Sequence, residues 1–386
     1  MKKRTTKKHS GKGVEVFVRV LCQIILGVSF AFSGFVKAID PLGSTYKIED
    51  YLSAFGPFWE YFEFLAFPAS ILLAAVEFTM GVNFLLNANI KLTKWCAVLF
   101  MLVMTPLTLY IALENPVSDC GCFGDAIVLS NWATFGKNIV FSVLLLLLIV
   151  LSKFSKDIYY NYQKWIITSV AFIASIGFSI YCYNLLPILD FRPYKKGNNI
   201  IEGMSIPEDA PLDKYETTFF YEKDGVEKAF TLDNYPAEDS TWTFVRQESK
   251  LIEQGYVPPI HDFSIVTEDG DITDIILEDA GYTLLIISHK VEKASTRNIK
   301  CIKSTIANAK KAGANVIWLT SSYTDEIDNF RTKYGINDTF GATDDITLKT
   351  IVRSNPGLVL IKDANIIEKW HHNSLPTKDE LNQLIN

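Results

Sequence analysis

Five long apolar runs constrain the fold of this chain more than any other feature of its sequence. Each run is about the 20 residues that an α-helix needs to cross a bilayer. Because backbone groups inside a bilayer must be paired within the chain, runs of this length predict membrane-spanning helices. We therefore predict five spans, at Val14–Ala38, Phe64–Leu86, Trp95–Leu113, Phe135–Leu151 and Trp165–Leu186.

The composition changes sharply after the fifth run. Of the 386 residues, 49% are hydrophobic and 21% are charged. The apolar residues are concentrated before about Leu186, whereas the remainder is rich in Asp, Glu and Lys. This division predicts a membrane part in contact with the lipid bilayer, followed by a soluble part. The net charge of −6 comes without a basic cluster, so we expect no nucleic-acid partner.

The distribution of Lys and Arg predicts the orientation of the spans. Basic residues gather in the N-terminal tail (residues 1–13), in the Asn87–Lys94 link and in the Ser152–Lys164 link. Positively charged loops stay in the cytoplasm, so these segments are expected there. Five spans then place everything after Leu186 on the other side. We predict a multi-pass protein of the cell inner membrane, with a cytoplasmic N-terminus and a periplasmic C-terminal domain.

Two thiols separated by one glycine lie in a short polar loop between the third and fourth runs, in the sequence Cys120-Gly121-Cys122. A disulfide between the two would close a small ring, and a strained disulfide is easier to reduce. Gly121 leaves room where such a ring is most crowded. The predicted topology places the loop on the oxidising side, where disulfide chemistry belongs. Two interpretations stay open: an exchanging redox pair, or a structural loop whose thiols are free or bridged elsewhere.

The remaining cysteines have simpler interpretations. Cys22 and Cys96 lie in the cytoplasmic halves of their spans, where small buried hydrophobic residues are expected. Cys182 lies near the outer end of the fifth run and is either buried and inert or within reach of a thiol of the outer loop. Cys301, in a predicted helix of the soluble part, is expected to be a packing residue.

An ionisable residue, Glu77, lies in the middle of the second run. A carboxylate at this depth is costly and needs a reason. It either has a partner inside the bundle, such as Asn83, Ser33 or Lys37, or it acts as a proton acceptor or cofactor contact. Both interpretations stay open.

These residues carry a resemblance. The stretch Gly34–Lys37 followed by Asp40-Pro41 resembles the DoxX-like family, and Glu77, Gly81 and the loop from Asp119 to Gly124 resemble its MauE branch. The resemblance covers roughly residues 14–152 and implies a four-helix membrane bundle, related in architecture to membrane proteins that exchange disulfides with quinones. Members of the MauE branch are associated with the maturation of disulfide-containing periplasmic enzymes.

What the resemblance implies for the site is specific. It implies that Cys120 and Cys122 are catalytic, with Gly121 and Glu77 in support. No cofactor is evident from the residues themselves, and a quinone is implied by the architecture alone. The fifth run, within residues 153–186, goes beyond the four-helix pattern and is expected to tether the outer domain.

Residues 187–256 are expected to form a linker and a small β region. Pro- and Gly-rich sequence leaves the membrane, and a hairpin is predicted around Lys223-Asp224-Gly225, with a further strand at Thr241–Arg246. The flanking strands of the hairpin are expected at Thr217–Tyr221 and Glu227–Leu232. The region is too short for a sizeable core, so we expect it to pack against its neighbour.

Residues 257–386 alternate between predicted strands and helices, which indicates an α/β layer fold. Strands are expected at 261–267, 282–288, 315–320, 358–362 and 366–371, and helices at 297–312, 325–334, 346–353 and 377–385. The order, with Ser354-Asn355-Pro356-Gly357 before an apolar strand, resembles the thioredoxin-like fold with Pro356 in the place of its cis-proline. The outer half as a whole is similar to a fusion common in DoxX-family proteins of Bacteroidetes.

The outer domain departs from the thioredoxin pattern at its expected active site. The stretch Ser288–Lys293, which follows the first central strand, contains no cysteine. The low-pKa thiolate that drives exchange is therefore missing from its usual place. We expect a degenerate module that binds a client through Asn355 and Pro356. The histidines lack the spacing of a metal site, and no metal is expected.

The predicted fold is thus an α-helical membrane bundle, four helices plus one tethering span, followed by an α/β thioredoxin-like extracytoplasmic domain. The leading hypothesis is a membrane-bound thiol–disulfide redox protein, an oxidoreductase acting on periplasmic client proteins through Cys120 and Cys122. The alternative is a non-catalytic membrane assembly or maturation factor whose outer domain binds a partner protein. A small-solute transporter is a third hypothesis with weaker support, because no pair of broken spans marks a midplane site.

Overall fold

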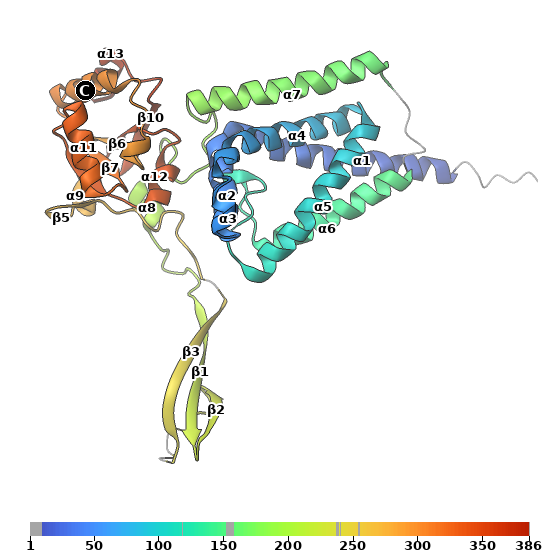
Figure 1. Ribbon diagram of the computed structural model, residues 1–386, viewed down its shortest axis with the longest axis horizontal. Coiled ribbons are helices and arrows are strands. Elements are labelled where there is room, and N and C mark those ends of the chain that lie inside the picture. The colour runs from blue at the N-terminus through green and yellow to red at the C-terminus, as the bar shows by residue number, and fades with distance from the viewer. Residues whose placement is uncertain are drawn as a thin grey trace, which may run out of the picture.

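The computed structural model describes residues 10–117, 119–151, 158–236, 239, 241–253 and 255–385. These residues form a helical part and an α/β domain, and a narrow three-stranded sheet projects from the segment that joins them (Figure 1). The start of the basic tail, up to residue 9, lies outside the described residues. So do Lys153 and Lys156, on which the predicted orientation partly depends.

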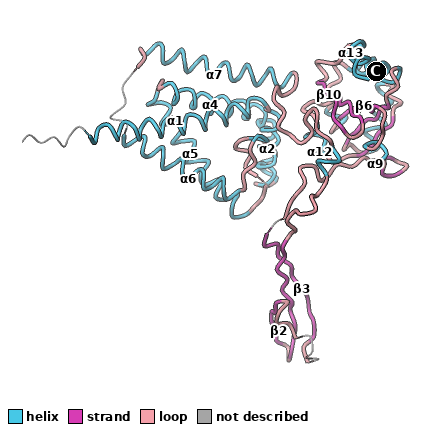
Figure 2. Tube along the Cα trace, turned by 180° about the vertical axis from the view of Figure 1, so that it is seen from behind, coloured by secondary structure: helices cyan, strands magenta, loops and turns pink. Residues whose placement is uncertain are grey.

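All five expected spans are helices in the structure. They are long and apolar enough to cross a membrane, and they exceed the predicted runs by a few residues at several ends. The helices are α1 (Ser10–Ile39), α4 (Ala66–Leu86), α5 (Ile90–Glu114), α6 (Asn131–Val150) and α7 (Asn161–Asn184). The fifth, α7, packs alongside α1 and α4 (Figure 2).

The closest packing in the bundle is between α1 and α4, and two glycines allow it. A Cβ atom at Gly34 would lie 2.2 Å from the backbone nitrogen of Phe78, and one at Gly81 would lie 2.2 Å from that of Ala31. Small residues let membrane helices approach closely, so that van der Waals contact and short polar contacts can form between them. This close approach brings Lys37 of α1 next to Glu77 of α4.

A short helix lies across the outer end of the bundle, at a steep angle to the spans and between them and the outer domain (Figure 1). This helix, α2 (Pro41–Ala54), begins at the N-cap Asp40, whose carboxylate accepts a hydrogen bond from the Gly43 amide at 2.9 Å. It is followed by α3 (Pro57–Glu60) and the 3-10 turn η1 (Glu63–Leu65). The segment between the first two spans is therefore mainly helical.

The outer domain is built on a seven-stranded sheet with the order β10-β9-β6-β7-β8-β4-β5. Strands β6, β7 and β8 are parallel, whereas β9 and β10 run antiparallel to their neighbours. The strands are β4 (Val266–Thr267), β5 (Gly270–Asp271), β6 (Tyr282–Ile287), β7 (Asn315–Thr320), β8 (Thr339–Ala342), β9 (Gly357–Lys362) and β10 (Asn365–His371). The peptide bond before Pro356 is cis, as the resemblance implied.

Helices accompany this sheet, and apolar side chains pack in two clusters within the domain. The helical elements of the linker and domain are α8 (Ile200–Met204), α9 (Thr273–Leu277), η4 (Val291–Lys293), α10 (Ile299–Lys311), α11 (Thr324–Tyr334), α12 (Asp345–Ile351) and α13 (Lys378–Ile385). The sequence predicted the four longer helices but neither α9 nor β8. Most of the strand expected at 261–267 is irregular, because only its last two residues pair with a neighbour.

The expectation that the small β region packs against its neighbour is wrong. Its strands are β1 (Lys214–Lys223), β2 (Val226–Thr231) and β3 (Thr243–Glu253), ordered β2-β1-β3 and antiparallel. Every residue of β3 is exposed, and the sheet extends away from both the bundle and the outer domain (Figure 2). Aromatic contacts within the sheet, such as Tyr221 with Phe230 and Phe244, take the place of a separate core.

Candidate functional site

The two cysteines of the outer loop lie side by side. Cys120 and Cys122 are both free, and their sulfur atoms are 3.0 Å apart. Gly121 between them has a φ of +65°, a left-handed conformation that favours glycine. Its amide donates to Asp119 Oδ2 at 2.8 Å, which closes the turn. The loop therefore presents two neighbouring thiols in a compact turn.

Helices α1 and α2 hold this turn by its backbone carbonyls. The Tyr51 hydroxyl donates to the Cys120 carbonyl at 2.7 Å, and Lys37 Nζ donates to the Cys122 carbonyl at 2.6 Å. The Ser33 hydroxyl donates to the same Cys122 carbonyl at 2.6 Å. These bonds fix the backbone of both cysteines.

The partner of Glu77 is Lys37. The ammonium nitrogen lies 2.9 Å from Glu77 Oε2 and 2.7 Å from the Ser33 hydroxyl, and both charged side chains are buried. A buried charge is tolerated when it is paired and hydrogen-bonded. Of the partners proposed from the sequence, Lys37 and Ser33 belong to the Glu77 network, whereas the Asn83 amide oxygen accepts from Thr168 on α7.

A cavity of about 190 Å³ opens inside the bundle next to both cysteines. Its wall is mostly apolar and comes from α1, α2, α4, α5 and α6 and from the loop that holds the cysteines. The polar groups that reach it, apart from the thiols and Lys37 with Glu77, include Lys137 and Asn138 of α6. Cys120 is only 7% exposed. The thiols thus border an apolar chamber within the membrane part.

Lys137 places a second cation beside the thiols. Its Nζ lies 4.5 Å from the centre of the Phe123 ring and hydrogen-bonds to Cys122. The hydrogen bond between the two thiols, together with Lys137 and Lys37, lowers the pKa of Cys122 to about 6, against the effect of burial. The same hydrogen bond and burial raise the pKa of Cys120. These surroundings favour Cys122 as the thiolate of the pair and Cys120 as its protonated neighbour.

A second cavity, of about 200 Å³, lies on the other side of the loop, between α2 and the outer domain. Its lining contains many charged side chains and includes residues of α12 and of the linker that follows α7. Ser44, Lys47 and Gly121 line both cavities. The loop that holds the cysteines and helix α2 therefore lie between a charged interdomain cleft and the apolar chamber.

The other residues singled out from the sequence lie apart from this loop. Asn355 accepts a hydrogen bond from Ser288 and donates to the Lys290 carbonyl, so it ties down the turn that follows β6. Pro356 is buried in this arrangement. Cys182 is buried and free, and Cys301 is exposed on α10, contrary to the expected packing role.

Sequence reasoning missed three contributors to the site. Lys137 was detectable, because it is an ionisable residue inside an apolar run, the same signal that identified Glu77. Tyr51 lies outside the predicted spans, and no local pattern connects it with the Cys120 carbonyl. Arg353 gave no signal, because its partners lie in a distant part of the chain. Within the described residues, no group of three or more His, Cys, Asp or Glu side chains is arranged to hold a metal ion.

The comparisons with known proteins agree with the membrane part. Residues 15–151 match the family described as methylamine utilisation protein MauE, and this range holds four of the five candidate spans and the Cys-Gly-Cys loop. Residues 215–254, the projecting sheet, match a domain of unknown function. No curated protein matches the chain.

Several solved structures are similar to part of the chain. One of them is a solution structure from Bacteroides thetaiotaomicron, provisionally assigned as a protein disulfide isomerase, with 17% identity and a TM-score of 0.23. The match covers 32% of this chain and 81% of that protein. The five candidate spans and the family match identify the chain as a multi-pass membrane protein whose helical region is similar to MauE.

Proposed function

We propose that this protein is a membrane thiol–disulfide oxidoreductase that exchanges disulfides with client proteins through Cys120 and Cys122. The observation that carries the proposal is the pair of free thiols 3.0 Å apart, one of which has a pKa lowered to about 6. A thiolate is the reactive form in exchange, and a thiol whose pKa lies near ambient pH is well suited to attack.

The proposed reaction uses the two cysteines in turn. The Cys122 thiolate attacks one sulfur of a client disulfide, the client S–S bond breaks, and the second client sulfur leaves as a thiolate that takes up a proton. Cys120 then loses its proton and attacks the Cys122 sulfur of the mixed disulfide. This releases the first client sulfur as a thiol and leaves a Cys120–Cys122 disulfide. The client is reduced by two electrons, the pair is oxidised by two, and the reverse sequence oxidises a client dithiol.

The apolar chamber supports a lipid-soluble redox partner of the quinone class. Its wall is largely apolar, it borders both sulfur atoms, and Lys137 offers an ammonium group to an electronegative oxygen. A quinone bound there would exchange two electrons and two protons with the cysteine pair. Lys37 and Glu77 would keep the Cys122 backbone in place at the chamber wall during this exchange.

We further propose that the outer domain is thioredoxin-like, periplasmic and degenerate. The order β10-β9-β6-β7-β8, with three parallel strands and a cis-proline before β9, supports that fold. The absence of a cysteine from Ser288–Lys293 supports a role in binding and not in exchange. The basic Asn87–Lys94 link supports a cytoplasmic position for that end of the bundle and a periplasmic position for the loop and the outer domain of an inner-membrane protein.

The test measures the redox state of the two cysteines in intact membranes. Differential alkylation and mass spectrometry report this state across a series of dithiol/disulfide buffers. We expect a reversible couple, and loss of client exchange in both Cys120→Ser and Cys122→Ser. Exchange that persists in both single variants would overturn the proposal.

A membrane assembly or maturation factor is the second candidate. It is favoured by the absence of cysteine from Ser288–Lys293 and by the low exposure of Cys120. In that case the two thiols would remain free, or bridged and resistant to reduction, over the whole buffer series.

A further inference from the structure

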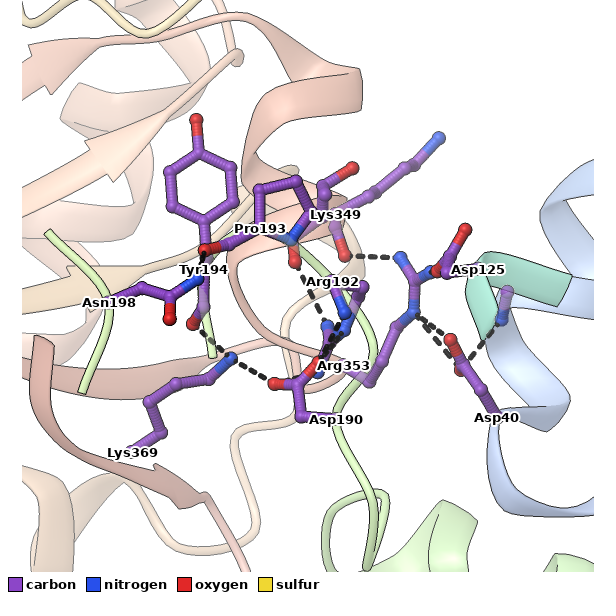
Figure 3. Close-up of polar contacts among 12 residues, drawn as sticks. Asp40, Asp125, Asp190, Arg192, Pro193, Tyr194, Asn198, Lys349, Arg353 and Lys369 are labelled. Carbon is purple, nitrogen blue, oxygen red and sulfur yellow. Dashed lines mark hydrogen bonds and ion pairs between the residues drawn. The ribbon is translucent and has the colours of Figure 1, made fainter. Parts of the chain in front are cut away.

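Arg353 of the outer domain contacts two residues of the membrane part, Asp40 and Asp125 (Figure 3). Its Nε lies 3.0 and 2.8 Å from the two carboxylate oxygens of Asp40, and its Nη2 lies 3.3 Å from Asp125 Oδ2. Asp40 is the residue between α1 and α2, and Asp125 lies in the 3-10 turn η2 (Gly124–Ala126) that follows Cys122. One side chain therefore links the outer domain to two points of the helical part.

Arg353 is itself held firmly in the outer domain. Its side chain is only 7% exposed, and its Nη1 donates to the Lys349 carbonyl at 2.5 Å. It immediately precedes the Ser354-Asn355-Pro356 turn. Beside it, Arg192 of the linker donates to the Thr350 carbonyl (Figure 3). A guanidinium group whose aliphatic side chain is buried and one of whose nitrogens is hydrogen-bonded can position its partners rigidly.

Apart from the Ser33 hydroxyl at the Cys122 carbonyl, four polar contacts among the described residues anchor the redox loop (residues 119–125), and Arg353 supplies the last of them. Lys47 of α2 pairs with Asp119 at 2.6 Å, Tyr51 of α2 holds the Cys120 carbonyl, and Lys37 of α1 holds the Cys122 carbonyl. The fourth anchor is the contact of Arg353 with Asp125. Through Asp40, Arg353 also fixes the junction of α1 and α2, the two helices that provide the other anchors. We propose that Arg353 is a positioning residue of the Cys120/Cys122 pair, so that the docked outer domain completes the redox site.

The energetics of the contact support a positioning role. Burial alone would raise the pKa of Asp40, but Arg353 and Arg192 lower it below its ordinary value, so the pair stays charged. Removing one partner of a buried ion pair leaves an uncompensated charge, which is strongly destabilising locally. The site is also closely fitted, because a Cβ atom at Gly43 would lie 2.5 Å from Asp40 Oδ2 and 2.9 Å from Arg353 Nη2.

The role in exchange rests on the proposed function, but the positioning itself can be measured without it. The experiment uses the full chain in membrane vesicles and compares Arg353→Gln, Arg353→Lys and Asp40→Asn. Arg246→Gln is the control, because Arg246 pairs with Glu227 and Glu248 on the projecting sheet, away from the loop. The readouts are the alkylation rate of Cys122 and the midpoint potential of the Cys120/Cys122 couple.

We expect Arg353→Gln and Asp40→Asn to raise the alkylation rate about tenfold and to shift the midpoint by about 30 mV, the equivalent of a tenfold change in the equilibrium constant. Arg353→Lys should give an alkylation rate and a midpoint between those of Arg353→Gln and the unaltered protein. Lysine keeps the positive charge, but its ammonium group cannot bind Asp40 and Asp125 at once as a guanidinium does. In the double variant, the changes in alkylation rate and midpoint should be no larger than in either single variant, because both substitutions remove the same contact. The control should match the unaltered protein.

The outcomes separate the two ideas. If Arg353→Gln and Asp40→Asn leave both readouts unchanged while the couple itself is reversible, the positioning role is wrong and the proposed function stands. If no reversible couple exists but alkylation rises as expected, the positioning role stands and the proposed function fails. Should Arg353→Gln not fold, Asp40→Asn decides the matter, because Asn remains a good N-cap for α2.

Discussion

Lys37 Nζ lies 2.9 Å from Glu77 Oε2, and the same ammonium donates to the Cys122 carbonyl at 2.6 Å. The buried ion pair that joins α1 to α4 is thus directly continuous with the backbone of the redox loop. Lys37 therefore has two roles: it pairs with Glu77 inside the bundle, and it holds the backbone of Cys122 in place. Substitutions can separate these two roles.

Glu77→Gln should destabilise the bundle, because it leaves the Lys37 charge buried without its carboxylate. Loss of one partner of a buried pair costs about 3–5 kcal/mol. Thermal unfolding in detergent should show a clear fall in Tm relative to Glu114→Gln, which removes an exposed carboxylate at the end of α5.

The double variant Lys37→Met/Glu77→Leu should recover much of that stability, because an apolar pair can replace a buried ion pair. It should not recover the redox behaviour, since the Cys122 carbonyl has lost its ammonium donor. Equal Tm values for Glu77→Gln and Glu114→Gln would contradict the first expectation.

The reactivity of Cys122 should depend on pH with a midpoint near 6, well below the range of an ordinary thiol. Above this pH the thiolate predominates and alkylation is fast, whereas below it the thiol is protonated and alkylation slows. Lys137→Met should move the midpoint upward, because a cation that favours the thiolate is lost.

The matched control for this experiment is Lys91→Met, which removes an exposed cation at the start of α5. Stopped-flow alkylation with a neutral reagent, quantified for each cysteine by mass spectrometry, gives the two profiles. A midpoint that stays in place in Lys137→Met would show that Lys137 does not act on the thiolate.

Acid should loosen the junction between α7 and the outer domain through Asp190. Burial alone would raise the pKa of Asp190, but Arg192 and Lys369 lower it to about 2. A carboxyl whose pKa is lower in the folded state stabilises the fold at pH values above its unfolded pKa, which is 3.8 for Asp190. For Asp190 this stabilisation is about 2 kcal/mol, and it is lost as the pH falls toward 2.

Asp190→Asn should therefore be less stable at neutral pH and should lose less stability between pH 4 and pH 2. Acid titration followed by tryptophan fluorescence measures both effects. The exposed Asp269→Asn variant, in the turn between β4 and β5, is the control. An acid response in Asp190→Asn as large as that of the unaltered chain would count against the Asp190 contact.

The parts of the fold that the sequence predicted are those governed by local or strongly periodic signals. The five apolar runs are helices because an α-helix satisfies all backbone hydrogen bonds within a single segment, which a lipid environment requires. The cysteines meet because they are two residues apart. The long central strands β6, β7 and β9 were found because buried strands read as continuous apolar runs.

The parts that were missed depend on tertiary context. Helix α2 has a mixed composition without a long apolar run, and β8 has four residues and takes its conformation from β7. Arg353 and Asp40 are 313 residues apart, so no local pattern of the chain connects them. The projecting sheet was expected to need a neighbour, but its aromatic side chains pack on one another.

Ser44, Lys47 and Gly121 line both the charged interdomain cleft and the apolar chamber. The turn that holds the cysteines therefore lies between the two cavities. If the cysteines exchange disulfides as we propose, they would pass electrons from one cavity to the other by making and breaking sulfur bonds. A water-borne protein and a lipid-borne molecule could then react with the same pair of atoms without ever occupying the same space.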